Sequence, residues 1–78
     1  MNNFQNISAM LRFHRRKAGL SQHELAKLAG VGKTVVFDLE KGKETVKLDT
    51  LKKIFLALNI TMKFDSPIMQ DYERETHK

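Results

Sequence analysis

The chain of 78 residues is long enough for one domain and lies near the lower size limit at which a chain buries enough apolar surface to fold alone. It contains no cysteine, which excludes disulfide bonds, cysteine-containing zinc sites and thiol nucleophiles and agrees with a reducing, cytoplasmic setting. No segment approaches the roughly 20 apolar residues of a membrane span, and no secretory signal pattern is present, so we expect a soluble intracellular protein.

Charge is distributed unevenly along the chain. Residues 1–64 hold 12 of the 14 Lys and Arg residues and 5 of the 9 Asp and Glu residues, a net charge of +7. Residues 65–78 hold the remaining 2 basic and 4 acidic residues, a net charge of −2. A basic domain is the expected footprint of a nucleic-acid binder, because neutralising phosphates releases counterions. Charge alone agrees equally well with a solvated surface that keeps the protein soluble.

Four helices separated by short turns are expected before residue 60. The first covers residues 6–19, with Asn6 as its N-cap and Gly19 at its end. Its apolar face repeats at helical spacing, with Ile7, Leu11, His14 and Ala18. Because His14 lies on this face, we interpret it as a hydrogen-bonded core histidine and not as a catalyst or ligand.

The second helix is expected over residues 21–30. Ser21 stands three residues before Glu24, the spacing of a capping box in which each residue satisfies a free N–H of the other. Gly30 ends the helix. The residues expected on its apolar face are Leu25, Leu28 and Ala29.

The third and fourth helices are expected over residues 33–42 and 48–59. The inward side of the third helix is expected to carry Val36, Leu39 and Glu40. Its outward side is expected to carry Thr34, Phe37, Asp38 and Lys41. The fourth is the clearest amphipathic helix of the chain, with an apolar face of Leu48, Leu51, Ile54, Phe55 and Leu58.

The pattern changes from helical to alternating in residues 60–65. Ile60, Met62 and Phe64 alternate with polar residues, which predicts a half-buried strand. No other segment offers this strand a partner, so we expect it to pair with the same strand of a second copy. The prediction is therefore an all-α helical bundle with one C-terminal β-strand that pairs across a homodimer. Residues 1–65 form this domain, and the polar residues 66–78 form a flexible tail.

The stretch GVGKT, residues 30–34, resembles the end of a nucleotide-binding P-loop. That loop requires a glycine five residues before its Gly-Lys pair, and Lys27 stands there. A P-loop also follows a buried strand, whereas the residues upstream have helical spacing. Nucleotide binding is therefore rejected.

The same glycines suit a helix-turn-helix. Residues 29–32 join the second and third helices, with glycines that allow a tight turn and Val31 as an apolar plug beneath it. In the DNA-binding form of this motif, the first helix crosses the phosphate backbone and the start of the second enters the major groove. The sequence therefore favours DNA binding.

This docking mode assigns roles to residues at the start of each helix. Ser21 and Gln22 lie where the helix N-terminus approaches the phosphate backbone. Lys33 and Thr34 lie where side chains first reach base edges, so Lys33 is expected to donate to guanine and Thr34 to contact a thymine methyl or a base edge.

Four further residues follow along the third helix and its exit. Phe37 is expected to lie against thymine methyls, and Asp38 to accept from cytosine N4 or repel a wrong base. Lys41 and Lys43 are expected at phosphates. Each has an alternative interpretation: Phe37 packs on protein, Asp38 is merely solvated, and the lysines are ordinary surface charges.

Residues 20–43, LSQHELAKLAGVGKTVVFDLEKGK, resemble the Cro/C1-type (XRE) helix-turn-helix of bacterial and phage regulators. The resemblance covers roughly residues 7–60 and implies a lambda repressor-like DNA-binding fold. It also implies that Arg15 pairs with Glu40 and that Gln22 clamps a phosphate. Gly32 departs from the pattern, because the family usually has Ser or Thr there to cap the third helix.

The segments LDTLKKIFLALNI and TMKFDSP are similar to those of HipB-like antitoxins, the DNA-binding partners of HipA-type kinase toxins. In these antitoxins the C-terminal strands of two subunits pair. The resemblance implies a dimeric repressor of double-stranded operator DNA that represses its own operon and holds a HipA-like kinase inactive.

Two other functions remain open. One is a free-standing phage or chromosomal repressor without a toxin. The other is a protein-interaction module that uses Phe13, Val35 and Phe37 and scarcely touches DNA. No arrangement of residues supports an enzyme, a cofactor or a metal site.

Overall fold

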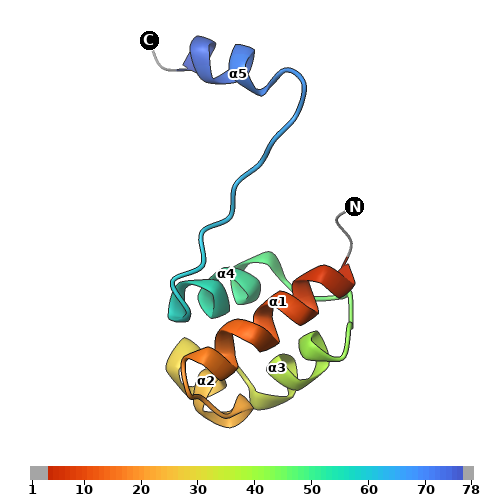
Figure 1. Cartoon of the computed structure of the whole chain (residues 1–78), viewed down its shortest axis with the longest axis vertical. Helices are drawn as coiled ribbons and strands as arrows, with labels where there is room; N and C mark the ends of the chain where they lie inside the picture. Colours follow the sequence, from red (N-terminus) through yellow and green to blue (C-terminus); the bar gives the residue numbers. More distant parts are fainter. Residues whose placement is uncertain (1–3, 77–78) are drawn as a thin grey trace.

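The computed structural model describes residues 4–76, and within them the chain forms five helices and no strand. The helices are α1 (Phe4–Lys17), α2 (Gln22–Ala29), α3 (Lys33–Glu40), α4 (Leu48–Ala57) and α5 (Met69–Thr76). Helices α1 to α4 form a helical body, and α5 lies apart from it at the end of an extended linker (Figure 1). Residues 1–3 of the predicted domain and 77–78 of the predicted tail lie outside the described residues.

The core of the body lies between α1, α2, α3 and α4. Its buried apolar residues are Leu11, Leu25, Ala26, Val36, Leu39, Leu51, Ile54 and Phe55. The inward sides predicted for the third helix and for the centre of the fourth are therefore confirmed. Three residues predicted on apolar faces are exposed: Leu28 is 62% exposed, Leu48 is 63% exposed, and Ala18 lies exposed beyond the end of α1. Packing of α2 against α3 and α4 selects the small Ala26 in place of the larger Leu28.

Helix α1 begins earlier than the sequence predicts. It starts at Phe4, so Asn6 lies inside the helix and is not its N-cap. The propensity of one polar residue is a weak signal, and the packing of this helix on the core overrides it. The predicted end is confirmed: Gly19 has φ +74°, and the N–H groups of Gly19 and Leu20 donate to the carbonyls of Arg16 and Arg15 in a Schellman motif.

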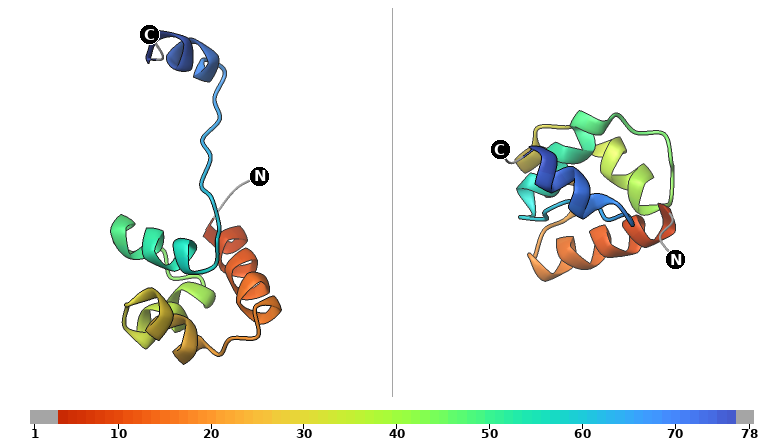
Figure 2. Two further views of the ribbon diagram at one scale, coloured as in Figure 1. Left: turned by 90° about the vertical axis from the view of Figure 1, so that its left-hand side faces the viewer. Right: turned by 90° about the horizontal axis from the view of Figure 1, so that it is seen from above.

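Residues 60–66 form an extended linker in place of the predicted strand (Figure 2). The prediction of a strand is wrong for the single chain, since a strand exists only when a neighbour completes its hydrogen bonds, and the described chain offers none. Ile60 and Met62 pack half-buried against the core, whereas Phe64 is 76% exposed. Pairing across a dimer stays a prediction.

Helix α5 occupies part of the segment that the sequence analysis assigned to a flexible tail. It follows Pro67 and contains an ion pair between Asp71 and Arg74, three residues apart. The hydroxyl of Thr76 donates to the carbonyl of Tyr72. Helix-favouring residues after a proline were the available signal, and the polar composition masked it. None of the helices in residues 4–76 has the length and apolar character needed to cross a membrane.

Candidate nucleic-acid interface

Helices α2 and α3 pack on each other around a turn built as the sequence predicts. Gly30 has φ +75°, a conformation that side chains rarely adopt, and its N–H donates to the carbonyl of Lys27. Val31 is half-buried against the core, and its N–H donates to the Ala26 carbonyl at 2.9 Å. This turn fixes α3 against α2 as a helix-turn-helix.

The start of each helix in this pair is defined by its cap. The capping box of α2 is confirmed, because the Ser21 hydroxyl accepts from the N–H of Glu24 and the Glu24 carboxylate accepts from the N–H of Ser21. These bonds hold the pKa of Glu24 below its ordinary value. Gly32 is the N-cap of α3 and provides no side-chain bond, so the first turn of α3 lacks this source of stabilisation.

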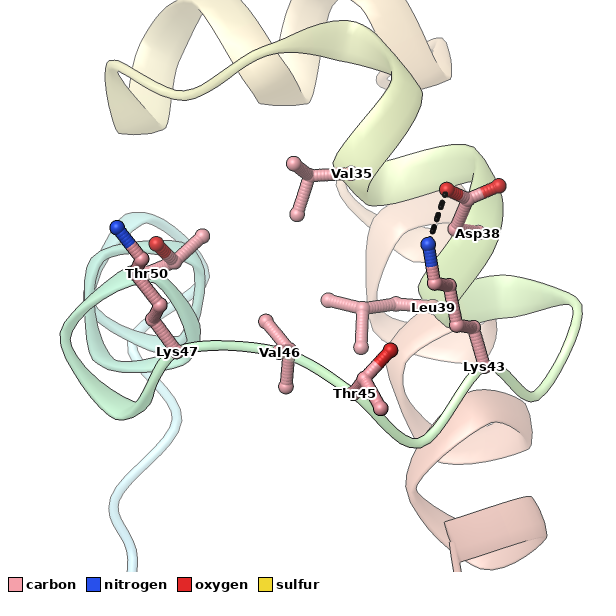
Figure 3. A pocket seen from close by; sticks show the side chains of 8 residues that line it. All are labelled: Val35, Asp38, Leu39, Lys43, Thr45, Val46, Lys47 and Thr50. Carbon is pink, nitrogen blue, oxygen red and sulfur yellow. Dashed lines mark ion pairs between the residues drawn. The ribbon is translucent and has the colours of Figure 1, made fainter.

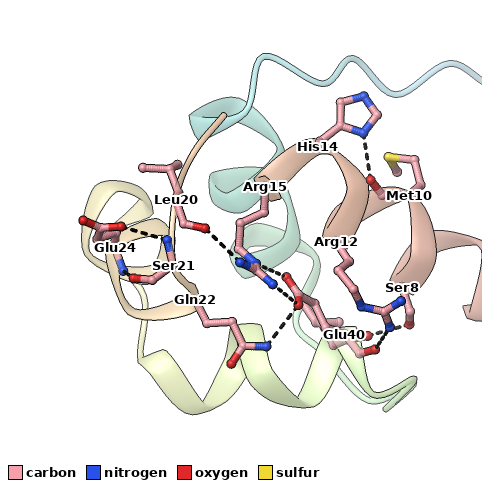
Figure 4. Close-up of polar contacts among 11 residues, drawn as sticks. Ser8, Met10, Arg12, His14, Arg15, Leu20, Ser21, Gln22, Glu24 and Glu40 are labelled. Carbon is pink, nitrogen blue, oxygen red and sulfur yellow. Dashed lines mark hydrogen bonds and ion pairs between the residues drawn. The ribbon is translucent and has the colours of Figure 1, made fainter. Parts of the chain in front are cut away.

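A buried carboxylate, that of Glu40, joins α1, α2 and α3 (Figure 4). Arg15 donates to it twice, from Nε to Oε2 at 2.6 Å and from Nη2 to Oε1 at 2.9 Å. Gln22 adds a third bond, from Nε2 to Oε1 at 3.0 Å. Arg15 also donates to the carbonyl of Leu20 at 2.8 Å. The position of α3 relative to the other two helices therefore depends on one charged group.

The protonation state of Glu40 follows from these contacts. Burial opposes its ionisation, but the hydrogen bonds from Arg15 and Gln22 and the charge of Arg15 outweigh burial and hold the pKa of Glu40 below its ordinary value. The Arg15 pKa is raised, chiefly by its hydrogen bond to Glu40. Both groups are thus charged at neutral pH, and the buried pair keeps its full attraction.

Two more residues of α1 contact the end of α3, and the sequence analysis missed them. The Ser8 hydroxyl donates to the carbonyl of Leu39, and Arg12 Nη2 donates to the carbonyl of Glu40 at 2.7 Å. Carbonyls at a helix end lack partners within the helix, and a cation there also interacts favourably with the helix dipole. With Arg15, these residues occur at helical spacing, a polar stripe that the search for apolar residues overlooked.

A cleft of about 290 Å³ separates the start of α2 from α3. We call it the α2–α3 cleft. The residues that line it are Gln22, His23, Lys33, Thr34 and Phe37. The structure therefore brings together four of the residues assigned to DNA and adds His23, to which the sequence assigned no role. Lys33, Thr34 and Phe37 are exposed, whereas Gln22 is half-buried because one side of its amide contacts Glu40.

Phe37 extends the α2–α3 cleft with a cationic partner. The Lys41 ammonium lies 5.0 Å from the centre of the Phe37 ring, a cation–π contact. Phe37 is 46% exposed, so the alternative of a ring fully packed on its own protein does not hold in the single chain. An apolar ring and a positive charge thus share one surface.

Asp38 faces a second groove on the other side of α3, together with Lys43 (Figure 3). The Lys43 ammonium lies 3.6 Å from the Asp38 carboxylate, and Asp38 is half-buried. This groove of about 300 Å³ also contains Val35, Leu39, Thr45, Val46, Lys47 and Thr50. The predicted outward set therefore divides between two surfaces, and the acid is paired and not merely solvated.

The titratable groups of the part of the chain that the structure describes form no metal centre. No group of three or more His, Cys, Asp or Glu residues within residues 4–76 is arranged to hold a metal ion. His14 is half-buried on α1, and its Nδ1 donates to the carbonyl of Met10 at 2.7 Å, which confirms a hydrogen-bonded structural histidine.

The turn, the buried carboxylate and the α2–α3 cleft together define a helix-turn-helix domain. Residues 11–64 match the helix-turn-helix family, and the chain belongs to it. The chain is an XRE-type transcriptional regulator by this relationship, so the resemblance to the Cro/C1-type family is confirmed.

Relatives agree with this membership. The chain is 34% identical over 62 residues to the HTH-type transcriptional regulator y4mF of Sinorhizobium fredii, covering 80% of this chain and 82% of the relative. It is 39% identical over 52 residues to an HTH-type transcriptional regulator of Methanothermobacter thermautotrophicus, covering 67% and 75%. Both relatives are named as regulators and not as enzymes.

Among solved structures, the fold is similar to a chain of the HipA-HipB-O2-O3 complex. The TM-score is 0.76, with 22% sequence identity, over 86% of this chain and 94% of that chain. At this identity the similarity establishes the shared fold.

The buried carboxylate yields a stability prediction. Glu40→Gln should lower the free energy of unfolding at pH 7 by about 3 kcal/mol, because it leaves the buried Arg15 without its partner charge. Urea unfolding followed by circular dichroism measures this, with the exposed Glu44→Gln as control, expected to change stability by less than about 0.5 kcal/mol.

The same substitution should alter the pH dependence of stability. Because the folded-state pKa of Glu40 is lowered, its contribution is complete above its ordinary pKa of 4.5 and is lost as pH falls through the lower folded value. The difference between the native chain and Glu40→Gln should therefore shrink on acidification below pH 4.5. A difference that stays constant down to acid unfolding contradicts the assigned ion pair.

Proposed function

We propose that two copies of this chain bind a palindromic DNA operator, with the start of each α3 in the major groove. The observation that carries the proposal is the α2–α3 cleft, which combines Lys33 and Thr34 with the N-terminus of α2. In this docking mode the two recognition helices lie about 34 Å apart, one helical turn of DNA.

Residues of α3 and residues at the start of α2 contact different parts of the DNA. Lys33 donates to guanine, Thr34 contacts a thymine methyl or a base edge, and Phe37 lies against thymine methyls. Ser21 and Gln22 contact a phosphate at the start of α2, where backbone N–H groups and the helix dipole attract anions. Gln22 uses one amide hydrogen on Glu40 and keeps the second for this contact.

Lysines beyond α3 complete the phosphate contacts. Lys41 and Lys43 follow the end of the helix, and Lys43 offsets the charge of Asp38 at 3.6 Å. The ion pair with Lys43 reduces the repulsion between the Asp38 carboxylate and the phosphates, and Asp38 accepts a hydrogen bond from cytosine N4. Lys47 lines the same groove as Lys43 and extends the basic surface towards α4.

The proposed dimer forms through the linker. The linker of one copy pairs with the linker of the second copy through the segment that contains Ile60, Met62 and Phe64. The hydrogen bonds between the two segments satisfy backbone groups that have no strand partner in the single chain. Supporting this are the exposure of Phe64 and a largely apolar cavity of about 580 Å³ between α1, α4 and the linker. A second copy would cover both.

The specific role that we propose is that of a HipB-like antitoxin, which represses its own operon and binds a HipA-like kinase. The support is the similarity in fold to the HipB chain of a complex with HipA. Purification of the tagged chain from its native cells tests this. A stoichiometric kinase supports the antitoxin, whereas recovery of DNA alone supports a free-standing phage or chromosomal repressor.

An interaction module remains the alternative of a different class. It would use Phe13, Val35 and Phe37, but each of these residues lines a different cleft. They therefore form no continuous apolar surface, which favours DNA binding over this alternative.

Substitutions in the cleft test the proposed contacts with DNA. Lys33→Ala and Thr34→Ala should each weaken binding to an operator obtained by in vitro selection by about 1–3 kcal/mol, because each removes a base contact. Binding to random DNA should change less, and Lys27→Ala on the exposed side of α2 should leave the specificity ratio unchanged. Fluorescence anisotropy at several salt concentrations measures both. Equal losses on operator and random DNA contradict base contacts, and affinity independent of salt contradicts DNA binding through phosphates.

The dimer has its own test. Phe64→Asp should raise the dimer dissociation constant roughly 100-fold, since an unpaired polar group costs several kcal/mol to bury. Phe64 is exposed in the single chain, so the fold itself should survive. Sedimentation equilibrium measures the change, with Leu28→Asp as a control that is similarly exposed on α2. A Phe64→Asp chain whose dimer dissociation constant equals that of the native chain rules out this interface.

A further inference from the structure

Of the helices in residues 4–76, α5 is the one without a buried residue. It spans eight residues, and a helix shorter than about 12–15 residues is marginal in water on its own. Ile68 and Tyr72 are 68% and 62% exposed. A stable α5 therefore requires a surface that covers this apolar pair.

The exposed side of α5 combines apolar and acidic groups. Ile68, Asp71, Tyr72 and Glu75 follow each other at intervals of three, one and three residues, which places them on one side of a helix. Residues 69–76 contain three acidic residues and one basic residue. The complementary surface must then be apolar and basic.

The outward side of α4 has this character. Leu48, Lys52 and Leu56 recur every four residues, and Leu48 and Leu56 are 63% and 76% exposed. Lys53 lies beside this stripe, and both lysines line a groove of about 680 Å³ between α4 and the linker. Apolar side chains make up most of the remaining lining, among them Phe55, Leu56, Ile60, Met62 and Phe64.

We propose that α5 docks on the outward side of α4 in a second copy of this chain. Ile68 covers Leu48, the Tyr72 side chain extends towards Leu56, and Asp71 and Glu75 approach Lys52 and Lys53. Charge complementarity carries the choice of surface, since residues 69–76 have a net charge of −2 and Lys52 and Lys53 are exposed next to each other on α4.

The path of the linker indicates the second copy. Residues 60–66 run away from the body and carry α5 to the side on which α4 lies, opposite α2 and α3 (Figures 1 and 2). Seven extended residues cover about 20 Å, so two antiparallel linkers side by side bring each α5 to the α4 of the other copy. The inference thus rests on the proposed dimer, and it adds an exchanged arm that leaves both DNA-binding clefts open.

The lack of cysteine permits a clean crosslinking test. A full-length Leu56→Cys chain is mixed with a full-length Tyr72→Cys chain and treated with a short bismaleimide. We expect a covalent heterodimer in which mass spectrometry identifies the two substituted positions. Leu28→Cys replaces Leu56→Cys in the control, because it is 62% exposed but lies on α2. The pair Lys52→Cys and Glu75→Cys repeats the test with the apolar contacts intact.

Each outcome separates the exchanged arm from the dimer. Crosslinking of Leu56→Cys to Tyr72→Cys between chains, absent with Leu28→Cys, supports the arm. A chain with both substitutions that links only to itself overturns docking on a second copy. A protein that sediments as a dimer but gives no crosslink in either pair overturns the arm and leaves the operator-binding dimer intact, whereas a monomer overturns both.

Charge exchange provides a second readout. Lys52→Glu with Lys53→Glu should raise the dimer dissociation constant about two- to fivefold for each ion pair lost, and Asp71→Lys with Glu75→Lys should restore it in the same chain. No recovery in the combined variant overturns the assigned pairing.

Discussion

The ion pair between Arg15 and Glu40 is the interaction on which the rest of the structure depends. Glu40 of α3 is only 4% exposed. Its carboxylate accepts hydrogen bonds from Arg15 of α1 and Gln22 of α2. A body this small has a limited apolar core, so apolar packing alone fixes helix positions weakly. Directional bonds to a buried charge fix them more strictly, because an unpaired charge there is costly. The α2–α3 cleft owes its shape to this constraint.

The α2–α3 cleft and the linker lie on opposite sides of the body. Helices α2 and α3, which carry the α2–α3 cleft, lie on one side of the body, and α4 lies on the side of the linker and α5 (Figure 1). Association of two copies through the linker side therefore leaves both clefts exposed. Gln22 lines the cleft and donates to the buried Glu40, so the cleft is connected to the core. Substitutions of core residues that make no contact with DNA are therefore expected to affect DNA binding.

The sequence predicts the four-helix body well because its signals are local. The capping box of Ser21 and Glu24, the turn at Gly30 and the inward side of α3 follow from spacing alone. What it missed depends on three-dimensional partners. Leu28 is apolar yet exposed, since the neighbours of α2 select its buried side. Residues 60–65 have a strand pattern but form no strand, because the described residues contain no neighbouring strand to complete the hydrogen bonds. The polar composition of α5 hid this helix from prediction.

The most direct test is to locate the surface of the protein that contacts DNA. Backbone amide chemical shifts of the full-length protein, recorded by NMR as an operator from in vitro selection is added, report this surface. We expect the largest changes at Gln22, His23, Lys33, Thr34 and Phe37, with little change along α5. Changes centred on Phe13 of α1 or on α4, with the cleft unaffected, would contradict it.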